Sequence, residues 1–123
     1  MKNILFLAVL FTVGTAVKAQ QGFPRRTVEE RVQITHQKLD SAFKLDNAKL
    51  TEADSIFATF YRSAEKTREE MMAGGQTDFQ AMREKMQPAM DERDQKLKGI
   101  LTEEQYKTWK DQIEPSLRPR RPQ

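Results

Sequence analysis

The 123-residue chain has no cysteine, one histidine and a formal net charge of +3 at pH 7. Without cysteine there is no disulfide framework, and one histidine does not make the cluster of His and Cys ligands that transition metals ordinarily use. Hydrophobic residues make up 37% of the chain, which is low beside the roughly 45–50% of ordinary globular domains even when glycine is allowed for. The composition therefore favours a thin helical layer over a thick core.

Residues 1–19 have the pattern of a cleavable secretory signal. Lys2 precedes a largely apolar run from Ile4 to Val13, and Ala19 is a small residue at the expected cleavage site. The run is shorter than the roughly 20 apolar residues that span a membrane. We therefore predict an exported chain without stable membrane insertion, in which residues 20–26 form a flexible arm; an uncleaved anchor is the alternative.

A first helix is predicted from Thr27, which can cap it while Glu30 reaches back in a capping box. Side chains at spacings of three and four then form one narrow apolar stripe: Val28, Val32, Thr35, Leu39 and Phe43. His36 lies beside this stripe. Because a metal site normally needs several converging ligands, we interpret His36 as a surface or boundary residue, with metal ligation as the alternative.

The second helix is predicted to follow a break at residues 45–49, where Asp46 and Asn47 favour a turn. We place its start at Leu50-Thr51 and its end near Ala73, because Gly74-Gly75 comes next. This helix has the most aromatic surface of the chain: Ile56, Phe57, Phe60, Ala64 and Met71, flanked by Tyr61. It is the best candidate for a central helix.

A third helix is predicted after Thr77 or Asp78, with an apolar face of Phe79, Met82, Met86, Met90 and Leu97. Pro88 lies inside it. Proline lacks an N–H and its ring clashes with the carbonyl four residues earlier, so we expect a kink or a division of this helix.

The last helix is predicted to begin after Leu101, where Thr102 and Gln105 form another capping box. Its apolar side carries Tyr106, Trp109 and Ile113, and Pro115 is expected to end it. The helical domain then spans residues 27–114, and residues 115–123 form a flexible basic tail. From 27 to 117 there are 14 Lys and Arg against 18 Asp and Glu, a net charge of −4.

The motifs of enzymes and of nucleic-acid binders are missing. The sequence has no catalytic cysteine, no nucleophile elbow and no phosphate-binding loop, and the spacing of its acidic residues fits exposed helix faces. Basic residues concentrate in the terminal segments instead of on one structured face. We predict neither catalysis nor a cofactor, and no nucleic-acid partner.

Methionine is the feature that stands out. Met82, Met86 and Met90 recur every four residues, and Met71-Met72 lies across the glycine turn from them. Flexible, polarisable methionine side chains repack against varied apolar shapes, which suits a promiscuous binding surface. Three interpretations stay open: core filler, a surface that binds client proteins, and a soft-metal thioether site.

The stretch Leu101-Thr102-Glu103-Glu104-Gln105 has an echo in Leu50-Thr51-Glu52-Ala53-Asp54. Both copies precede an apolar helical run, and the first has Asp54 where the second has glutamine. Two such motifs on a small exported helical chain resemble the Spy/CpxP family of periplasmic proteins, which is known for LTxxQ motifs. The resemblance covers about residues 27–117.

The resemblance implies an all-α fold of four helices in a bent, thin hairpin that pairs antiparallel into a cradle-shaped homodimer. Such a cradle binds unfolded or partly folded clients without ATP, and some relatives instead damp an envelope-stress sensor kinase. Metal-responsive relatives use histidine-rich segments or His and Met ligands. This chain lacks those histidines, which argues against zinc or nickel binding.

We therefore expect an ATP-independent chaperone-like protein of the periplasm. Its client-binding residues are predicted to be Phe57, Phe60, Met71, Met82, Met86 and Met90. The motif residues are predicted to start helices and anchor their junctions: Leu50, Thr51, Leu101, Thr102 and Gln105. The alternatives are a regulator that docks on an envelope sensor domain and a metal-binding stress protein.

Overall fold

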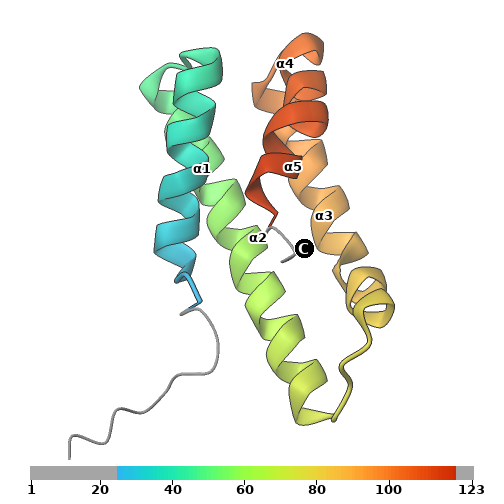
Figure 1. The fold of residues 1–123 in the computed structure, drawn as a ribbon. Coiled ribbons are helices and arrows are strands. Elements are labelled where there is room, and N and C mark those ends of the chain that lie inside the picture. The colour runs from blue at the N-terminus through green and yellow to red at the C-terminus, as the bar shows by residue number, and fades with distance from the viewer. Residues whose placement is uncertain (1–24, 119–123) are drawn as a thin grey trace, which may run out of the picture.

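The structure is a computed structural model that describes residues 25–118 (Figure 1). It consists of α1 (Val28–Phe43), α2 (Asn47–Ala73), α3 (Phe79–Ile100) and a C-terminal helix built from α4 (Glu103–Thr108), the π-helical turn η1 (Trp109–Ile113) and α5 (Glu114–Leu117). This confirms the predicted all-α fold of four helices. The predicted signal and most of the predicted arm and tail lie outside the described residues.

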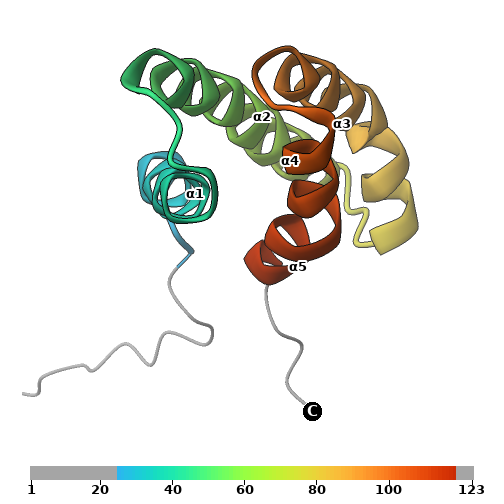
Figure 2. The same ribbon diagram turned by 90° about the horizontal axis from the view of Figure 1, so that it is seen from above.

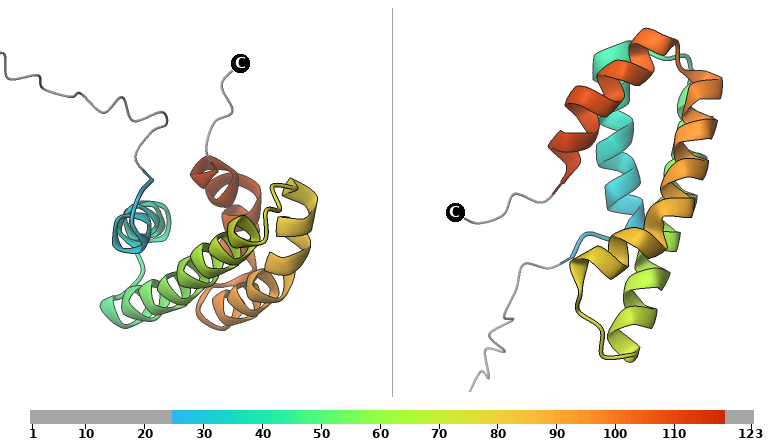
Figure 3. Two further views of the ribbon diagram at one scale, coloured as in Figure 1. Left: turned by 90° about the horizontal axis from the view of Figure 1, so that it is seen from below. Right: turned by 90° about the vertical axis from the view of Figure 1, so that its right-hand side faces the viewer.

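The helices form two layers. α2 and α3 lie side by side in one layer, and α1 and the C-terminal helix both stand on the same side of it (Figure 2). The view from below gives the same arrangement (Figure 3). In the described part of the chain, no helix is both long and apolar enough to cross a membrane.

Three helices begin as the sequence predicts: α3 is capped by Asp78, and the other two begin with capping boxes. The Thr27 hydroxyl accepts a hydrogen bond from the Glu30 N–H at 3.1 Å, and the Glu30 carboxylate accepts one from the Thr27 N–H at 3.3 Å. Thr102 and Gln105 make the same reciprocal pair at 3.1 and 3.0 Å. Each capping box satisfies two backbone donors that the first helical turn leaves unpaired.

The predicted start of the second helix at Thr51 is wrong. α2 begins at Asn47, because the Asp46 carboxylate caps it by accepting from the Lys49 N–H at 2.8 Å. Asp is as good an N-cap as Thr, and it comes earlier in the chain. Lys44 makes the break by adopting a left-handed conformation with φ of 50°. Thr51 is therefore an exposed residue inside the helix.

The two prolines have different effects. α3 passes through Pro88 as one helix, and its first part turns away from the rest (Figure 3), which is the kinked outcome of the prediction. The prediction that Pro115 ends the last helix is wrong, since the chain stays helical to Leu117. The wider η1 turn, closed by a bond from the Glu114 N–H to the Trp109 carbonyl, shifts the preceding carbonyls relative to an α-helix and accommodates the proline.

The core is centred on α2, as predicted. The Phe57 ring packs against Trp109 with centroids 5.0 Å apart, and both side chains are 1% exposed. This contact attaches the C-terminal helix to the α2–α3 layer, and α1 and α3 pack on α2 as well. The main cluster is completed by Val28, Leu39, Leu50, Ala53, Ile56, Tyr61, Leu97, Ile100, Leu101 and Ile113.

Thr35 is the polar residue in the apolar stripe of α1, and its hydrogen bonds explain its position there. Its side chain is fully buried. The Thr35 hydroxyl bonds to the Arg31 carbonyl at 2.9 Å and to the Tyr61 hydroxyl at 2.7 Å. A buried hydroxyl without partners would be costly, so this pair fixes how α1 sits on α2.

Candidate functional site

The turn between α2 and α3 is closed by backbone hydrogen bonds. The Gly75 N–H bonds to the Met72 carbonyl at 3.1 Å and the Gln76 N–H to the Met71 carbonyl at 2.9 Å. These two bonds, with Gly75 at a φ of 74°, form a Schellman motif that closes α2. Asp78 then caps α3 by accepting from the Gln80 N–H at 3.0 Å. The ends of both helices are therefore fixed.

Apolar side chains are exposed at this end of the molecule. We define the hairpin tip as residues 71–90, which comprise the end of α2, the turn and the first half of α3. Met72 is 61% exposed and Phe79 is 73% exposed, and they are the large hydrophobic residues that stand out to solvent in the described chain. They flank the turn on its two sides. Two large apolar side chains exposed near one turn, away from the main core, make this end of the molecule a candidate interaction site.

The predicted methionines divide into two groups at the hairpin tip. Met71 and Met86 are 4% and 6% exposed, so they are packing residues in this structure. Met82 and Met90 are half-buried and present part of their surface. The helical spacing placed the stripe correctly, but it did not tell which methionines face the neighbouring helix. Met72 and Phe79 were missed as site residues, although the Gly74-Gly75 turn between them is the signal for an exposed hairpin end.

The predicted aromatic part of the client surface is not available. Phe57 is a core residue that packs between Trp109 and Tyr61. Phe60 is half-buried, and the Arg93 guanidinium carbon lies 4.4 Å from its ring centroid. The prediction that Phe57 binds clients is corrected, because contact would require opening the core. Phe60 keeps only a partly covered edge.

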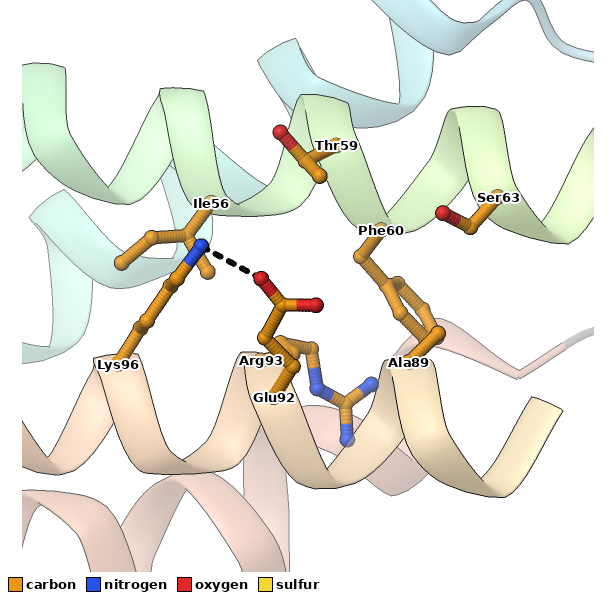
Figure 4. Close-up of a pocket in the computed structure, with 8 residues that line it drawn as sticks. All are labelled: Ile56, Thr59, Phe60, Ser63, Ala89, Glu92, Arg93 and Lys96. Carbon is orange, nitrogen blue, oxygen red and sulfur yellow. Dashed lines mark hydrogen bonds and ion pairs between the residues drawn. The ribbon is translucent and has the colours of Figure 1, made fainter.

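The pocket beside Phe60 has too little volume for an organic ligand. It lies between α2 and α3, and Figure 4 shows Phe60 and Arg93 in its lining, with the Lys96–Glu92 ion pair of 2.8 Å nearby. Its volume of about 10 Å³ is on the order of one water molecule. It is lined by Ile56, Thr59, Phe60, Ser63, Ala89, Glu92, Arg93 and Lys96.

A buried ion cluster joins α3 to the C-terminal helix. The Arg93 side chain is 5% exposed and contacts Asp94 at 2.8 Å and Glu114 at 3.3 Å. Lys110 bridges the same two carboxylates at 3.1 and 2.9 Å. Acidic residues were expected on exposed faces, yet Glu114 is 9% exposed. Both carboxylates are already paired with cations, so the cluster holds the fold together and offers no free base.

Two groups at the cluster, Lys110 and Tyr106, have raised pKa values. Burial lowers the pKa of Lys110, but hydrogen bonds to Glu114 and Asp94 and their negative charges outweigh that effect, so the pKa is raised above 10.5. Burial, followed by the charge of Asp94, raises the pKa of the Tyr106 phenol. Both groups therefore favour their protonated forms.

An open cleft of about 500 Å³ lies between α1 and the C-terminal helix. The Lys38 ammonium reaches across to the Ser116 hydroxyl at 3.1 Å. Its lining includes both apolar and polar side chains: Ile34, Gln37, Lys38, Ser41, Ala42, Gln112, Ile113 and Ser116. It is a second surface that sequence patterns did not indicate.

His36 links two helices. Its Nδ1 lies 2.9 Å from both carboxylate oxygens of Asp54, which joins α1 to α2. Within residues 25–118, no group of three or more His, Asp or Glu side chains is placed to hold a metal ion. The histidine is a boundary residue in this structure.

The motif residues act in the fold. Leu50 and Leu101 are buried in the main cluster, at 6% and 7% exposure, and Thr102 and Gln105 form a capping box.

No curated protein and no solved structure matches the chain. Residues 19–109, which include α1, α2, α3 and α4, match the family described as domain of unknown function DUF4890. The chain belongs to the DUF4890 family.

Proposed function

We propose that this protein is an ATP-independent chaperone-like protein of the periplasm that binds unfolded or partly folded clients at the hairpin tip. The observation that carries the proposal is the exposure of Met72 and Phe79 at 61% and 73%. A structured turn lies between these two side chains, and an apolar client segment that covered them would remove their apolar area from water, which is favourable. The tip replaces the buried Phe57 as the client surface.

The chemistry of the tip suits clients of varied sequence. Methionine has a flexible side chain that fits many apolar shapes, and half-buried Met82 and Met90 extend the surface along α3. Burial of apolar area gives about 25 cal/mol per Å² without directional demands, so binding is weak per contact and tolerant of sequence. Exposed charges on the same part of α3, including Arg83, Glu84 and Lys85, keep a complex in solution.

The test is suppression of client aggregation by residues 20–123 in a nucleotide-free buffer. We expect suppression at stoichiometric amounts, and we expect the Met72→Ser, Phe79→Ser double variant to lose it while its circular dichroism stays unchanged, because both side chains are exposed. Ile34→Ser in the cleft is the matched control and should suppress aggregation normally.

Two results would contradict the proposal. One is wild-type protein that fails to suppress aggregation at stoichiometric amounts. The other is a double variant as active as the wild type. Indifference to unfolded clients, together with one saturable partner recovered by crosslinking, would identify a regulator of an envelope sensor instead. Antiparallel pairing into a homodimer stays a prediction, which sedimentation equilibrium of the mature chain can test.

A further inference from the structure

All methionines other than Met1 are concentrated at the hairpin tip. The sequence has six methionines, and five of them fall within residues 71–90; it has no cysteine. Thioether groups and thiols are the side chains that two-electron oxidants convert to S-oxides. After the initiating methionine, every such group in this protein therefore lies within the hairpin tip, the part of the chain assigned to client binding.

These five sulfur atoms differ in accessibility. Met72 is 61% exposed, whereas Met71 beside it is 4% exposed and Met86 is 6% exposed. Met82 and Met90 fall between these limits. Because oxidation requires contact with the reagent, this difference sets an order of reaction: Met72 first, the two half-buried methionines next, and the two buried ones last.

We propose that the hairpin tip is an oxidant-sensitive modification site, at which oxidation of Met72 to the sulfoxide switches off client binding; this rests on the proposed function. The reagent class is a two-electron oxidant that transfers an oxygen atom to sulfur, such as hypochlorous acid. A lone pair of the thioether sulfur forms the new S–O bond, the O–Cl bond breaks, chloride leaves and a proton is released to water. Sulfur loses two electrons and chlorine gains them.

The effect follows from polarity. A sulfoxide is a strong hydrogen-bond acceptor, so it stays hydrated and resists burial against an apolar client. At Met72 this change leaves the fold intact, since the side chain stands in water and the turn is held by backbone bonds. At Met71 or Met86 the sulfoxide would enter a buried position and loosen the end of the hairpin. Low doses therefore alter binding, and high doses alter structure.

The experiment treats residues 20–123 with graded hypochlorous acid, quenches with free methionine, and maps oxidation of each methionine by peptide mass spectrometry. We expect Met72 to be half-oxidised at a dose at least about fivefold below that for Met71 and Met86. At the dose that oxidises Met72 alone, aggregation suppression should fall at least about threefold with unchanged circular dichroism. Equal oxidation of all five residues, or Met71 and Met86 reacting first, would overturn the inference.

A pair of variants isolates Met72. Met72→Leu keeps an apolar side chain that does not react, so whatever suppression this variant shows before treatment should be unchanged after the low dose. Met72→Gln imitates the polar product and should be weak without any oxidant. Client binding that survives oxidation of Met72, or an equal loss in Met72→Leu, overturns the switch while leaving the chaperone proposal in place. Failure of the untreated protein to bind clients overturns both.

Discussion

Replacing the two partners of the buried Arg93–Glu114 ion pair tests the interpretation of the ion cluster. The closest atoms are 3.3 Å apart, and at an effective dielectric constant of about 20 their attraction is about 5 kcal/mol before desolvation is counted. Desolvation offsets most of this gain. The remaining contribution is best measured as a difference, because removing one partner leaves the other buried without its counter-charge.

The two substitutions are expected to be unequal and coupled. Glu114→Gln leaves the buried Arg93 with Asp94 alone, which we expect to cost about 2 kcal/mol of unfolding free energy. Arg93→Met removes the buried cation itself, and Lys110 still neutralises Glu114 at 2.9 Å, so the cost should be about 1 kcal/mol. In the Arg93→Met background, Glu114→Gln should then cost less than about 1 kcal/mol.

Urea unfolding followed by circular dichroism at 222 nm gives the four free energies of this cycle. The expected coupling between Arg93 and Glu114 is at least about 1 kcal/mol, and Glu114→Gln should lower Tm by about 8–16 °C for a domain of this size. The Lys96–Glu92 pair on the exposed face of α3, with side chains 52% and 60% exposed, is the control and should couple by less than about 0.5 kcal/mol. Additive effects at Arg93 and Glu114, or coupling equal to that of the control pair, would refute the reasoning.

Three further predictions concern the motif, the turn and pH. Thr102→Ala should cost about 1 kcal/mol in urea unfolding because it removes a capping box, whereas Thr51→Ala should change stability by less than about 0.5 kcal/mol; equal costs would restore Thr51 as a cap. Gly75→Ala should cost about 1 kcal/mol, since its φ is 74°, while Gly99→Ala, which meets no atom within 4 Å, should be neutral or stabilising. The folded state holds the Lys110 proton more tightly than the unfolded chain does, because the pKa of Lys110 is raised in the fold. The stability that the Lys110 charge contributes is therefore complete below pH 10.5 and is lost as pH rises through the raised pKa. Lys110→Met should flatten the alkaline decline in unfolding free energy, and a decline of unchanged slope would contradict this.

The comparison of the two motif copies explains how far local patterns determine a helix. Thr102 is preceded by Leu101 in an extended conformation, so no earlier residue competes to start α4. Upstream of Thr51, Asp46 offers a carboxylate that caps just as well. In α2 the earlier cap, Asp46, starts the helix, whereas in α4 the motif threonine does. The similarity of the two motif copies does not reveal this difference.

The candidate site also has features that the sequence predicts and features that only packing decides. The repeating methionines of α3 and the glycine turn could be identified from spacing alone, and so could the position of the hairpin end. Which side chains are exposed there depended on the packing of α2 against α3, which covers Met86 and leaves Met72 at 61% exposure. The cluster of Arg93 and Glu114 was also unpredictable, because its members come from helices that are separated in sequence.

The sequence by itself determined the helical class, the central place of α2, the glycine turn and the starts of the first, third and last helices. It also limited the effect of Pro88 to two outcomes, of which the kink is one. These depend on local chemistry: hydroxyl or carboxylate caps, the missing proline N–H and the period of apolar residues. Only the tertiary structure decided that Phe57 is core, that Met72 and Phe79 are exposed, and that charges lie buried between α3 and α5. Whether a residue is buried depends on which element packs against its helix face, and the sequence of one helix does not specify that element.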